Sequence, residues 1–337
     1  MKLLTVLPVQ VVFSLMMSHI VKLKYLMKIL LVNLEKLIQL RIVVILEKKL
    51  NKEEKTMQTK IKKVGFNKIE IDGQILSVRD YKGIQSGDDV VIFKTKTGGY
   101  KLALNMGIEN KDTDYDIIGG FHFGLVPKDF TGRNNISNKR AKKLRGINEF
   151  SIWTQEHRPT CSPKGMSYIK RYDCWVDIYM CNNEHEAVGT SVAGKHFLAG
   201  SNNHGRINPN GNKDFLYKDF EAVAKLHGKR FITWDEFITA AKGVKEFASA
   251  REDDNGITKH HLDFISKYGI EQATGHNWVW SEKINDERAV LLGGGRGDGV
   301  NAGSRASDWS YYVWGSGWGI GCRFACGSLN HVLKSRK

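Results

Sequence analysis

Hydrophobic and polar residues alternate over short stretches between residues 58 and 110, which is the pattern of half-buried strands. One alternation, from Ile69 to Val78, is interrupted by Asp72-Gly73, a two-residue hairpin signal. Thr97-Gly98-Gly99 separates a second pair of apolar runs, 90–96 and 100–104. We therefore predict a small β-rich domain over residues 57–110.

Residues 111–149 are polar and contain the pair Asn134-Asn135, a composition typical of a connector. The connector includes a basic run from Lys139 to Arg145. A basic run can contact nucleic acid, but the chain from 57 onward has no second compact stripe of Lys and Arg. We interpret the run as a solvated loop and expect no nucleic-acid partner.

From Phe150 onward the pattern mixes helices and short strands. Residues 218–227 have a helical period, with Phe220, Val223 and Leu226 on one face, and Gly228 is a typical stop. Thr233 and Glu236 have capping-box spacing. The helix that follows turns four apolar residues inward: Phe237, Ala240, Ala241 and Val244. Short strands are expected at 175–179, 278–280, 289–292 and 320–325. The fold class is therefore α+β, with a large domain over residues 150–333.

Residues 1–56 differ from the rest in composition. Residues 3–17 are almost wholly apolar, and a basic stretch rich in Leu, Ile and Val follows. Three interpretations remain open: a signal or anchor segment, although the run is short for a span; an amphipathic helix over residues 26–38; or an upstream reading frame, with Met57 as the true start. The abrupt change at Met57 favours the third.

The net charge of +15 is uneven, since residues 1–56 contain ten Lys or Arg against four Asp or Glu. The five cysteines are an odd number with no CxxC spacing, which argues against a fully paired disulfide framework and against a zinc site. A reducing compartment of synthesis is the simplest account. Asp253 and Asp254 are interpreted as a plain acidic turn, so no metal and no cofactor are expected.

The segment from Leu291 to Leu329 combines many glycines with large aromatic residues. Ten glycines lie between 293 and 321, together with Trp309, Tyr311, Tyr312, Trp314 and Trp318. So much glycine cannot form a long helix without a large entropic cost. Aromatic residues with Gly, Ser, Asp and Arg are typical of an adaptable binding surface. A glycine-rich loop that covers the core is the structural alternative.

The order of short motifs from Gly119 to Val332 resembles the variable proteins of diversity-generating retroelements. These proteins have a C-type-lectin fold related to formylglycine-generating enzymes, and some determine phage tropism. The motifs are residues 120–124, 150–153, 158–161, 165–166, 174–179, 227–229, 235–237, 272–275, 278–280, 301–307, Trp309 and 320–321. Each motif is weak alone, and their order over some two hundred residues is specific. The resemblance does not extend over residues 1–56.

This resemblance implies a variable region at 293–329, in which asparagine codons of a template are changed at adenines during mutagenic retrohoming. Positions reachable from such codons are predicted to bind ligand: Arg296, Gly297, Asp298, Asp308, Ser310, Tyr311, Gly315, Gly317 and Gly319. Residues between them are predicted scaffold: Asn301, Gly303, Ser304, Arg305, Trp309, Trp314, Trp318 and Ile320. We expect the three tryptophans to anchor the loops into the core, and Arg296, Asp298 and Tyr311 to be the main contacts.

The resemblance also implies a function, that of a diversified receptor-binding protein at a phage tail tip or fibre. Its expected partners are a protein or glycan receptor on a host cell and other tail or surface proteins, with a homotrimer as its own assembly. Because the relatives include an oxidase that uses two cysteines, a formylglycine-generating-type enzyme is the alternative of another class. It requires Cys322 and Cys326 to share a solvent-reachable cleft, whereas we interpret them as buried small hydrophobes on one face. A bacterial surface adhesin of the same fold is a further alternative, and no catalytic residues are assigned.

Overall fold

The computed structural model describes residues 23–24, 26–27, 30–31, 33–34, 36–43, 59–105, 116–252 and 255–330. Two compact units are present, residues 1–58 and residues 59–337. The described residues of the first unit are helical, and their large apolar side chains, such as Leu30, are exposed. None of the helices in the described residues is long and apolar enough to span a membrane.

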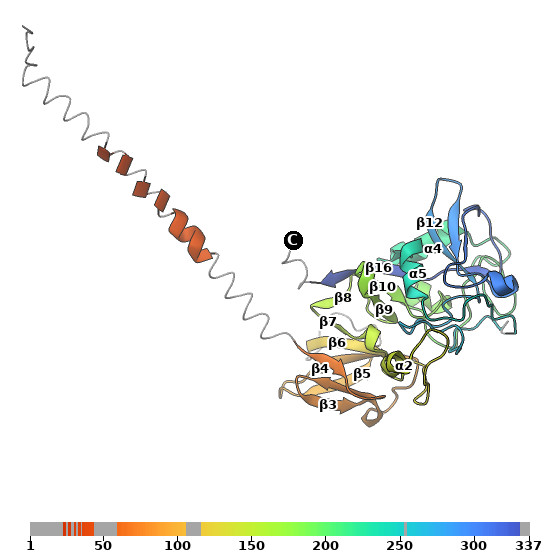
Figure 1. The fold of residues 1–337 in the computed structure, drawn as a ribbon, viewed down its shortest axis with the longest axis horizontal. Coiled ribbons are helices and arrows are strands. Elements are labelled where there is room, and N and C mark those ends of the chain that lie inside the picture. Colours follow the sequence, from red (N-terminus) through yellow and green to blue (C-terminus); the bar gives the residue numbers. More distant parts are fainter. Residues whose placement is uncertain are drawn as a thin grey trace, which may run out of the picture. The chain divides into compact units, whose positions relative to one another are not determined.

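In its described residues the second unit contains four small sheets, and the predicted β-rich part contributes strands to two of them (Figure 1). The first has the order β1-β2-β3, with strands Ile61–Lys63, Lys68–Ile71 and Gln74–Ser77. The second has the order β5-β4-β6-β7, with β4 Asp88–Lys94, β5 Tyr100–Leu104, β6 Asp116–Phe123 and β7 Trp153–Thr154. Both predicted hairpins are confirmed, since β2 pairs with β3 and β4 with β5.

The other two sheets belong to the predicted large domain. One has the order β11-β16-β10-β9, with β8 also paired to β16: β8 His157–Pro159, β9 Met166–Ile169, β10 Cys174–Asp177, β11 Arg230–Phe231 and β16 Phe324–Asn330. The other has the order β14-β13-β12-β15: β12 Trp278–Lys283, β13 Ala289–Leu292, β14 Ser307–Asp308 and β15 Ile320–Gly321. Figure 1 shows β3 to β5 at one end of this unit and β12 with α4 toward the other.

The helices are short: α2 Asn138–Leu144, α3 Asn183–Val188, α4 Tyr217–Leu226 and α5 Trp234–Ala240. Helix α4 confirms the prediction for residues 218–227 to within one residue, although Leu226 is exposed and does not face the core. Helix α5 confirms the capping box, because the Thr233 hydroxyl accepts from the amide of Glu236 and the Glu236 carboxylate accepts from the amide of Thr233. The described residues also form four 3-10 helices: η1 Val78–Asp80, η2 Glu149–Ser151, η3 Lys170–Tyr172 and η4 Arg296–Asn301.

The expectation of a polar connector over residues 111–149 is wrong for its described part. Strand β6 pairs with β4 along almost its whole length. Residues after it are buried in a small apolar cluster with Ile265: Val126, Phe130, Ile136, Ala141 and Leu144. Because β6 and this cluster are packed against their neighbours, residues 116–149 are an integral part of the fold.

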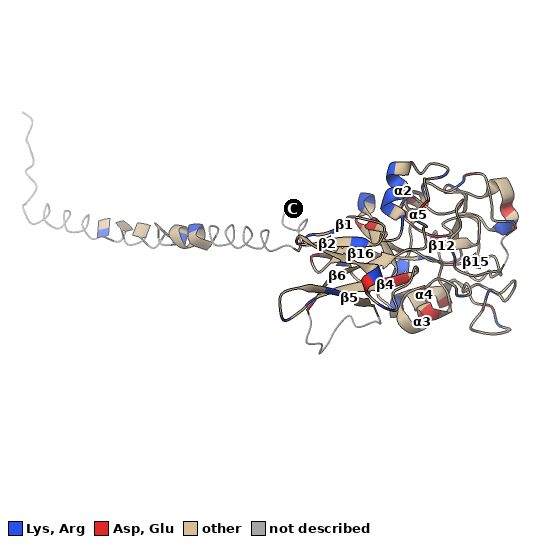
Figure 2. Cartoon of the chain, turned by 90° about the horizontal axis from the view of Figure 1, so that it is seen from below, with Lys and Arg blue, Asp and Glu red and all other residues tan. Residues whose placement is uncertain are grey.

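The basic run is also not a solvated loop, because residues 138–144 form helix α2 (Figure 2). Lys63 lies at the C-terminal end of this helix. Its ammonium donates to the carbonyls of Lys142, Arg145 and Ile147 at 2.6–2.8 Å. Burial lowers the pKa of Lys63 to about 8. The Arg140 guanidinium lies 3.9 Å from the centre of the Phe150 ring. The charge of Arg140 therefore packs on an aromatic ring, while Lys139 and Lys142 of the run are exposed.

Candidate ligand-binding surface

The segment from 293 to 319 is held by a single sheet at three points. It leaves β13, returns as β14 beside β13, and ends in β15, which pairs in parallel with β12. The β13–β14 register places Leu291 opposite Asp308 and Leu292 opposite Ser307. The loops between these strands, 293–306 and 309–319, therefore start and end on fixed backbone.

The first loop begins with glycines that no other residue can replace without strain. Gly293 and Gly294 have φ of +91° and +76°, a region that L side chains rarely adopt. A Cβ on Gly293 would lie 2.8 Å from the Phe237 ring of α5, and one on Gly294 would lie 2.6 Å from the Cβ of Ala302. Helix α5 thus packs closely under the start of the loop.

Arg296 was expected to contact ligand, and the structure corrects this. Its side chain is only 4% exposed and donates to the carbonyl of His276 at 2.8 Å and to Asn277 Oδ1 at 3.2 Å. The neighbouring Asn277 also accepts from the buried Arg206 at 3.0 Å. A guanidinium has five donors, and those of Arg296 hold the loop to the backbone and side chain of residues 276–277.

The two predicted acidic contacts use their carboxylates within their own turns. Asp298 accepts from the amide of Gly295 at 2.6 Å, as a cap on η4. Asp308 accepts from the amide and the hydroxyl of Ser310 at 2.8 and 2.6 Å. Both carboxylates are half-buried, while Ser310 is exposed. These acids shape the loops and keep part of their surface open to solvent.

The predicted glycine positions differ in the space around them. A Cβ on Gly297 or Gly319 would meet no atom within 4 Å, and one on Gly317 would only reach Ile320 at 3.7 Å. A Cβ on Gly315 would lie 2.6 Å from the Tyr311 ring. None of these four glycines has a positive φ. Three of the four can therefore carry a Cβ without a change of backbone.

The three tryptophans predicted to anchor the loops in the core are on the surface. Trp309, Trp314 and Trp318 are 49%, 53% and 37% exposed. The apolar interior beneath them is already filled by a cluster that includes Trp280, Phe220 and Tyr217 of other elements. The prediction that these three rings anchor the loops in the core is therefore wrong, and the rings are available for contact at the surface.

These exposed rings are nevertheless held in place by neighbours. Trp314 stacks on Tyr312 at 4.7 Å and 20°. The Arg288 guanidinium lies 4.5 Å from the Tyr312 ring centre and donates to the Tyr312 hydroxyl at 3.0 Å. Trp318 lies 4.9 Å from the guanidinium of Arg206. Fixed aromatic rings give large contact area with little loss of side-chain entropy on binding.

Tyr311 is half-buried and joins the loop to the core. Its ring packs edge-on against Trp280 at 5.6 Å, and its hydroxyl donates to the carbonyl of Ser316 at 3.4 Å. Burial, followed by the nearby charge of Asp308, raises the pKa of Tyr311, so its phenol stays neutral.

The predicted scaffold residues fall into two groups. Gly303 and Ser304 are buried beside Glu246, whose carboxylate accepts from the Ser304 amide and hydroxyl at 2.8 and 2.6 Å. Ile320 is buried in the core, whereas Asn301 and Arg305 are exposed. Asn301 and Arg305 line a groove of about 920 Å³ beside the loop.

Phe247 of this groove is highly exposed in the structure and was not predicted from the sequence. Phe247 is 79% exposed and has a φ of +56°, a conformation that costs a bulky residue energy. It lies in the linker after α5, where no local pattern pointed to a surface. Val300, also in the groove, is 70% exposed.

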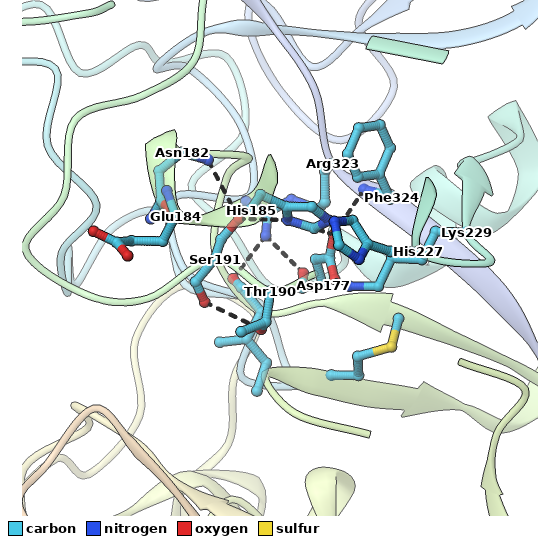
Figure 3. Close-up of polar contacts among 12 residues, drawn as sticks. Asp177, Asn182, Glu184, His185, Thr190, Ser191, His227, Lys229, Arg323 and Phe324 are labelled. Atoms are coloured by element: carbon cyan, nitrogen blue, oxygen red, sulfur yellow. Dashed lines mark hydrogen bonds and ion pairs between the residues drawn. The ribbon is translucent and has the colours of Figure 1, made fainter. Parts of the chain in front are cut away.

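Just after β15 the chain enters a buried cluster of charged residues, shown in Figure 3. Lys229 donates to Asp177 Oδ1 at 2.6 Å, and both side chains are almost fully buried. Arg323, two residues after β15, donates to the carbonyls of Asp177 and Ile178 at 2.8 and 2.6 Å and to that of Glu271 at 2.6 Å. The paired charges and carbonyls compensate the cost of burial and fix the chain just after β15.

Two further expectations concern chemistry. Among the described residues, no group of His, Cys, Asp and Glu is arranged to hold a metal ion, and Asp253 and Asp254 lie outside those residues. Cys322 and Cys326 are 0% and 2% exposed. They do not share a face, because Cys322 lies in one apolar cluster and Cys326 in another. The two-cysteine cleft required for the oxidase is not formed by this pair.

Comparison with known proteins finds similarity to phage proteins. No family model matches the chain. It is 26% identical over 263 residues to the tail fiber receptor-binding protein of Bordetella phage BPP-1, a match that covers 67% of each protein. The solved U1 variant of the major tropism determinant has a TM-score of 0.64, 24% identity, and coverage of 80% of this chain and 83% of its own. The P3c variant has a TM-score of 0.65, 24% identity, and coverage of 80% and 84%. The predicted resemblance and the α+β, C-type-lectin-type fold are confirmed.

Proposed function

We propose that this chain is a receptor-binding protein of a phage tail, and that the loops between β13 and β15 are its receptor-binding surface. The homology to a tail fiber receptor-binding protein supports receptor recognition by a phage and a place on the virion tail. The observation that carries the proposal is the combination of exposed, fixed aromatic rings with glycines that have room for a side chain. Its partners are a receptor on the host cell and other tail proteins.

The same surface supports the proposal of diversification by mutagenic retrohoming. Gly297, Gly317 and Gly319 accept substitution without a change of backbone, whereas Gly293 and Gly294 do not. Variation at the first set and constancy at the second would keep the fold while the surface changes. The test is the DNA beside the gene: a near-copy of codons 293–329 that differs only at adenines, close to a reverse-transcriptase gene, supports this mechanism.

The receptor-binding proposal is tested by adsorption of the purified full chain to host cells. Trp314→Ala removes a ring that is 53% exposed. Loss of such an aromatic contact costs about 2 kcal/mol, so we expect binding to weaken roughly 30-fold. Gly317→Tyr, which adds a ring to the same surface, should also change affinity without a loss of thermal stability.

The matched control for this experiment is Ile75→Ala, a change at an exposed apolar residue of β3. It should leave adsorption unchanged. Normal adsorption of the Trp314 and Gly317 variants would place receptor binding elsewhere, and weaker adsorption of the Ile75 variant would place it on the β-rich part. Sedimentation of the same preparation tests the homotrimer that we include in the proposal, because several weak sites on one particle raise avidity.

A purely binding role, without enzymatic activity, is also part of the proposal. It is supported by the homology to a receptor-binding protein and by the burial of Cys322 and Cys326. The formylglycine-generating alternative predicts oxidation of a cysteine-containing peptide by the purified chain, which we expect to be absent.

A further inference from the structure

Two cysteines far apart in the sequence lie side by side, Cys326 on β16 and Cys161 two residues after the end of β8. Strands β8 and β16 are antiparallel, with Pro159 opposite Ser328. The amide of Thr160 donates to the carbonyl of Gly327 at 2.9 Å, which continues the register by one residue. The next pair in this register is Cys161 and Cys326.

The position in the ladder determines how close these two residues are. Opposed residues of an antiparallel pair alternate between hydrogen-bonded and non-hydrogen-bonded positions. Because Thr160 and Gly327 are hydrogen-bonded, Cys161 and Cys326 occupy the non-hydrogen-bonded position. Cα atoms there are about 4.5 Å apart, within the range of about 4.4–6.8 Å that a disulfide spans.

The side chains of this pair already point at each other. Their sulfur atoms are 3.0 Å apart, and the Met166 sulfur lies 3.4 Å from that of Cys161. A disulfide needs a sulfur separation of about 2.05 Å, so a shift of about 1 Å closes the bond. Apolar neighbours, including Trp175 of β10 and Trp153 of β7, fix the pocket around the sulfurs.

The protonation of this pair differs from that of the other cysteines. The thiol of Cys161, the amide of Cys161 and the charge of Lys229 lower the pKa of Cys326 to about 7 against the effect of burial. The same hydrogen bond, together with burial, raises the pKa of Cys161, so the two sulfurs share one proton. Cys161 is half-buried, whereas the other four cysteines are buried. Cys181 and Cys322 are also neighbours, since the Cys181 amide donates to the Cys322 carbonyl at 2.8 Å. They are fully buried, and burial raises the pKa of both thiols well above the usual value.

We propose that Cys161 and Cys326 are an oxidative cross-linking site, at which a small disulfide such as oxidised glutathione joins β8 to β16. The proton between the two sulfurs passes to Cys326, and the Cys161 thiolate, the more exposed of the two, attacks one sulfur of the reagent and releases one thiol. The Cys326 sulfur, on loss of its proton, then attacks the sulfur of Cys161 and releases the second thiol. Two protein thiols and one external disulfide become one protein disulfide and two external thiols.

The cross-link closes a long loop that contains the whole receptor-binding surface. The two cysteines are separated by 165 positions, and a loop of this size restricts the unfolded chain strongly. The oxidised protein should therefore unfold at a temperature roughly 5–10 °C higher than the reduced protein. This inference does not depend on the identity of the receptor or on the proposed function.

The test uses the full chain, purified with a reductant and then treated with oxidised glutathione. Thiols titrated after denaturation should fall from five to three. Proteolysis without reductant should give one cross-linked peptide pair, which contains Cys161 and Cys326. Five remaining thiols, or a link that involves Cys174, Cys181 or Cys322, would overturn the proposal.

Serine variants provide the matched comparison. Cys326→Ser should abolish both the cross-link and the rise in unfolding temperature on oxidation, because Cys161 then has no second protein thiol to complete the exchange. Cys174→Ser, at another buried cysteine of the same sheet, should retain both effects. The peptide map of the unmodified chain decides the question even where a variant folds poorly.

Discussion

At the scale of single residues, glycine has two opposite uses in the variable region. At Gly293 and Gly294 it permits a positive φ and a close approach of α5 and Ala302. At Gly297 and Gly319 the backbone is ordinary and the surrounding space is open. The first use is a requirement of the fold, and the second leaves room for change at the surface.

This difference predicts the stability of two alanine variants. Gly294→Ala places a Cβ 2.6 Å from the Cβ of Ala302 at a positive φ. Strain and overpacking together should lower the free energy of unfolding by about 3 kcal/mol. Gly319→Ala should change it by less than about 0.5 kcal/mol.

Urea denaturation of both variants measures this difference. Equal losses of stability in the two would contradict the assignment of separate roles to these glycines.

The sequence predicted the loops of 293–319 better than it predicted the burial of their individual residues. The composition of 293–319 indicated a binding surface, because glycine content and aromatic content are read without knowledge of the fold. The burial of Arg296 could not be predicted, since its partners His276 and Asn277 come from a distant loop. The exposure of Trp309, Trp314 and Trp318 follows from a core already filled by residues such as Phe220 and Trp280.

At the scale of elements, local signals were reliable and the strand β6 was missed. The hairpin at Asp72-Gly73 and the capping box of α5 depend only on neighbouring residues. Strand β6 contains Gly119 and Gly120, which suggest a loop when read alone. A Cβ on Gly119 would lie 2.4 Å from the Trp153 carbonyl, and one on Gly120 would lie 2.4 Å from that of Val90. These glycines are explained only by strands that are remote in sequence.

Helix α5 supports the entry of the variable region, and its capping box offers a test. Thr233→Ala removes the acceptor for the Glu236 amide. We expect a loss of about 1 kcal/mol in the free energy of unfolding. Receptor adsorption at a temperature where the variant is folded should be unchanged, because Thr233 only positions α5.

Denaturation and adsorption of the same preparation measure the two effects. A loss of adsorption in the folded variant would show that α5 does more than support the loop.

At the scale of the whole molecule, the buried polar cluster couples stability to pH. Burial, and then the charges of Lys229 and His227, hold the pKa of His185 well below its ordinary value of 6.5. Below pH 6.5 His185 binds a proton in the unfolded chain and remains neutral in the folded chain. The free energy of unfolding should therefore fall as the pH decreases through 6.5, by about 1.4 kcal/mol per pH unit.

The pKa of His260 is shifted in the opposite direction, so this residue affects stability in a different pH range. Burial alone would lower its pKa, but the carboxylate of Glu271, 3.0 Å away, raises it above 6.5. Its contribution is complete below pH 6.5 and is lost as the pH rises through the raised value. It is therefore constant in the range where His185 acts.

The measurement is urea denaturation between pH 7 and pH 5 of the native chain and of His185→Asn, in which the amide can replace the ring nitrogen that lies 3.0 Å from Ser191 Oγ. The slope below pH 6.5 should decrease in the variant. An unchanged slope would assign the acid sensitivity to other groups.

The three attachments of the variable region to one sheet also restrict how it can evolve. The chain must travel from β13 to β14 and from β14 to β15 within fixed distances, and the β13–β14 register sets Leu292 opposite Ser307. A residue added or deleted within β14 would shift that register by one and turn inward side chains outward. A replacement leaves every register intact. Under the proposal of mutagenic retrohoming, variation would therefore change side chains on loops of constant length, and a process that rewrites bases without changing their number is the kind that such an architecture tolerates.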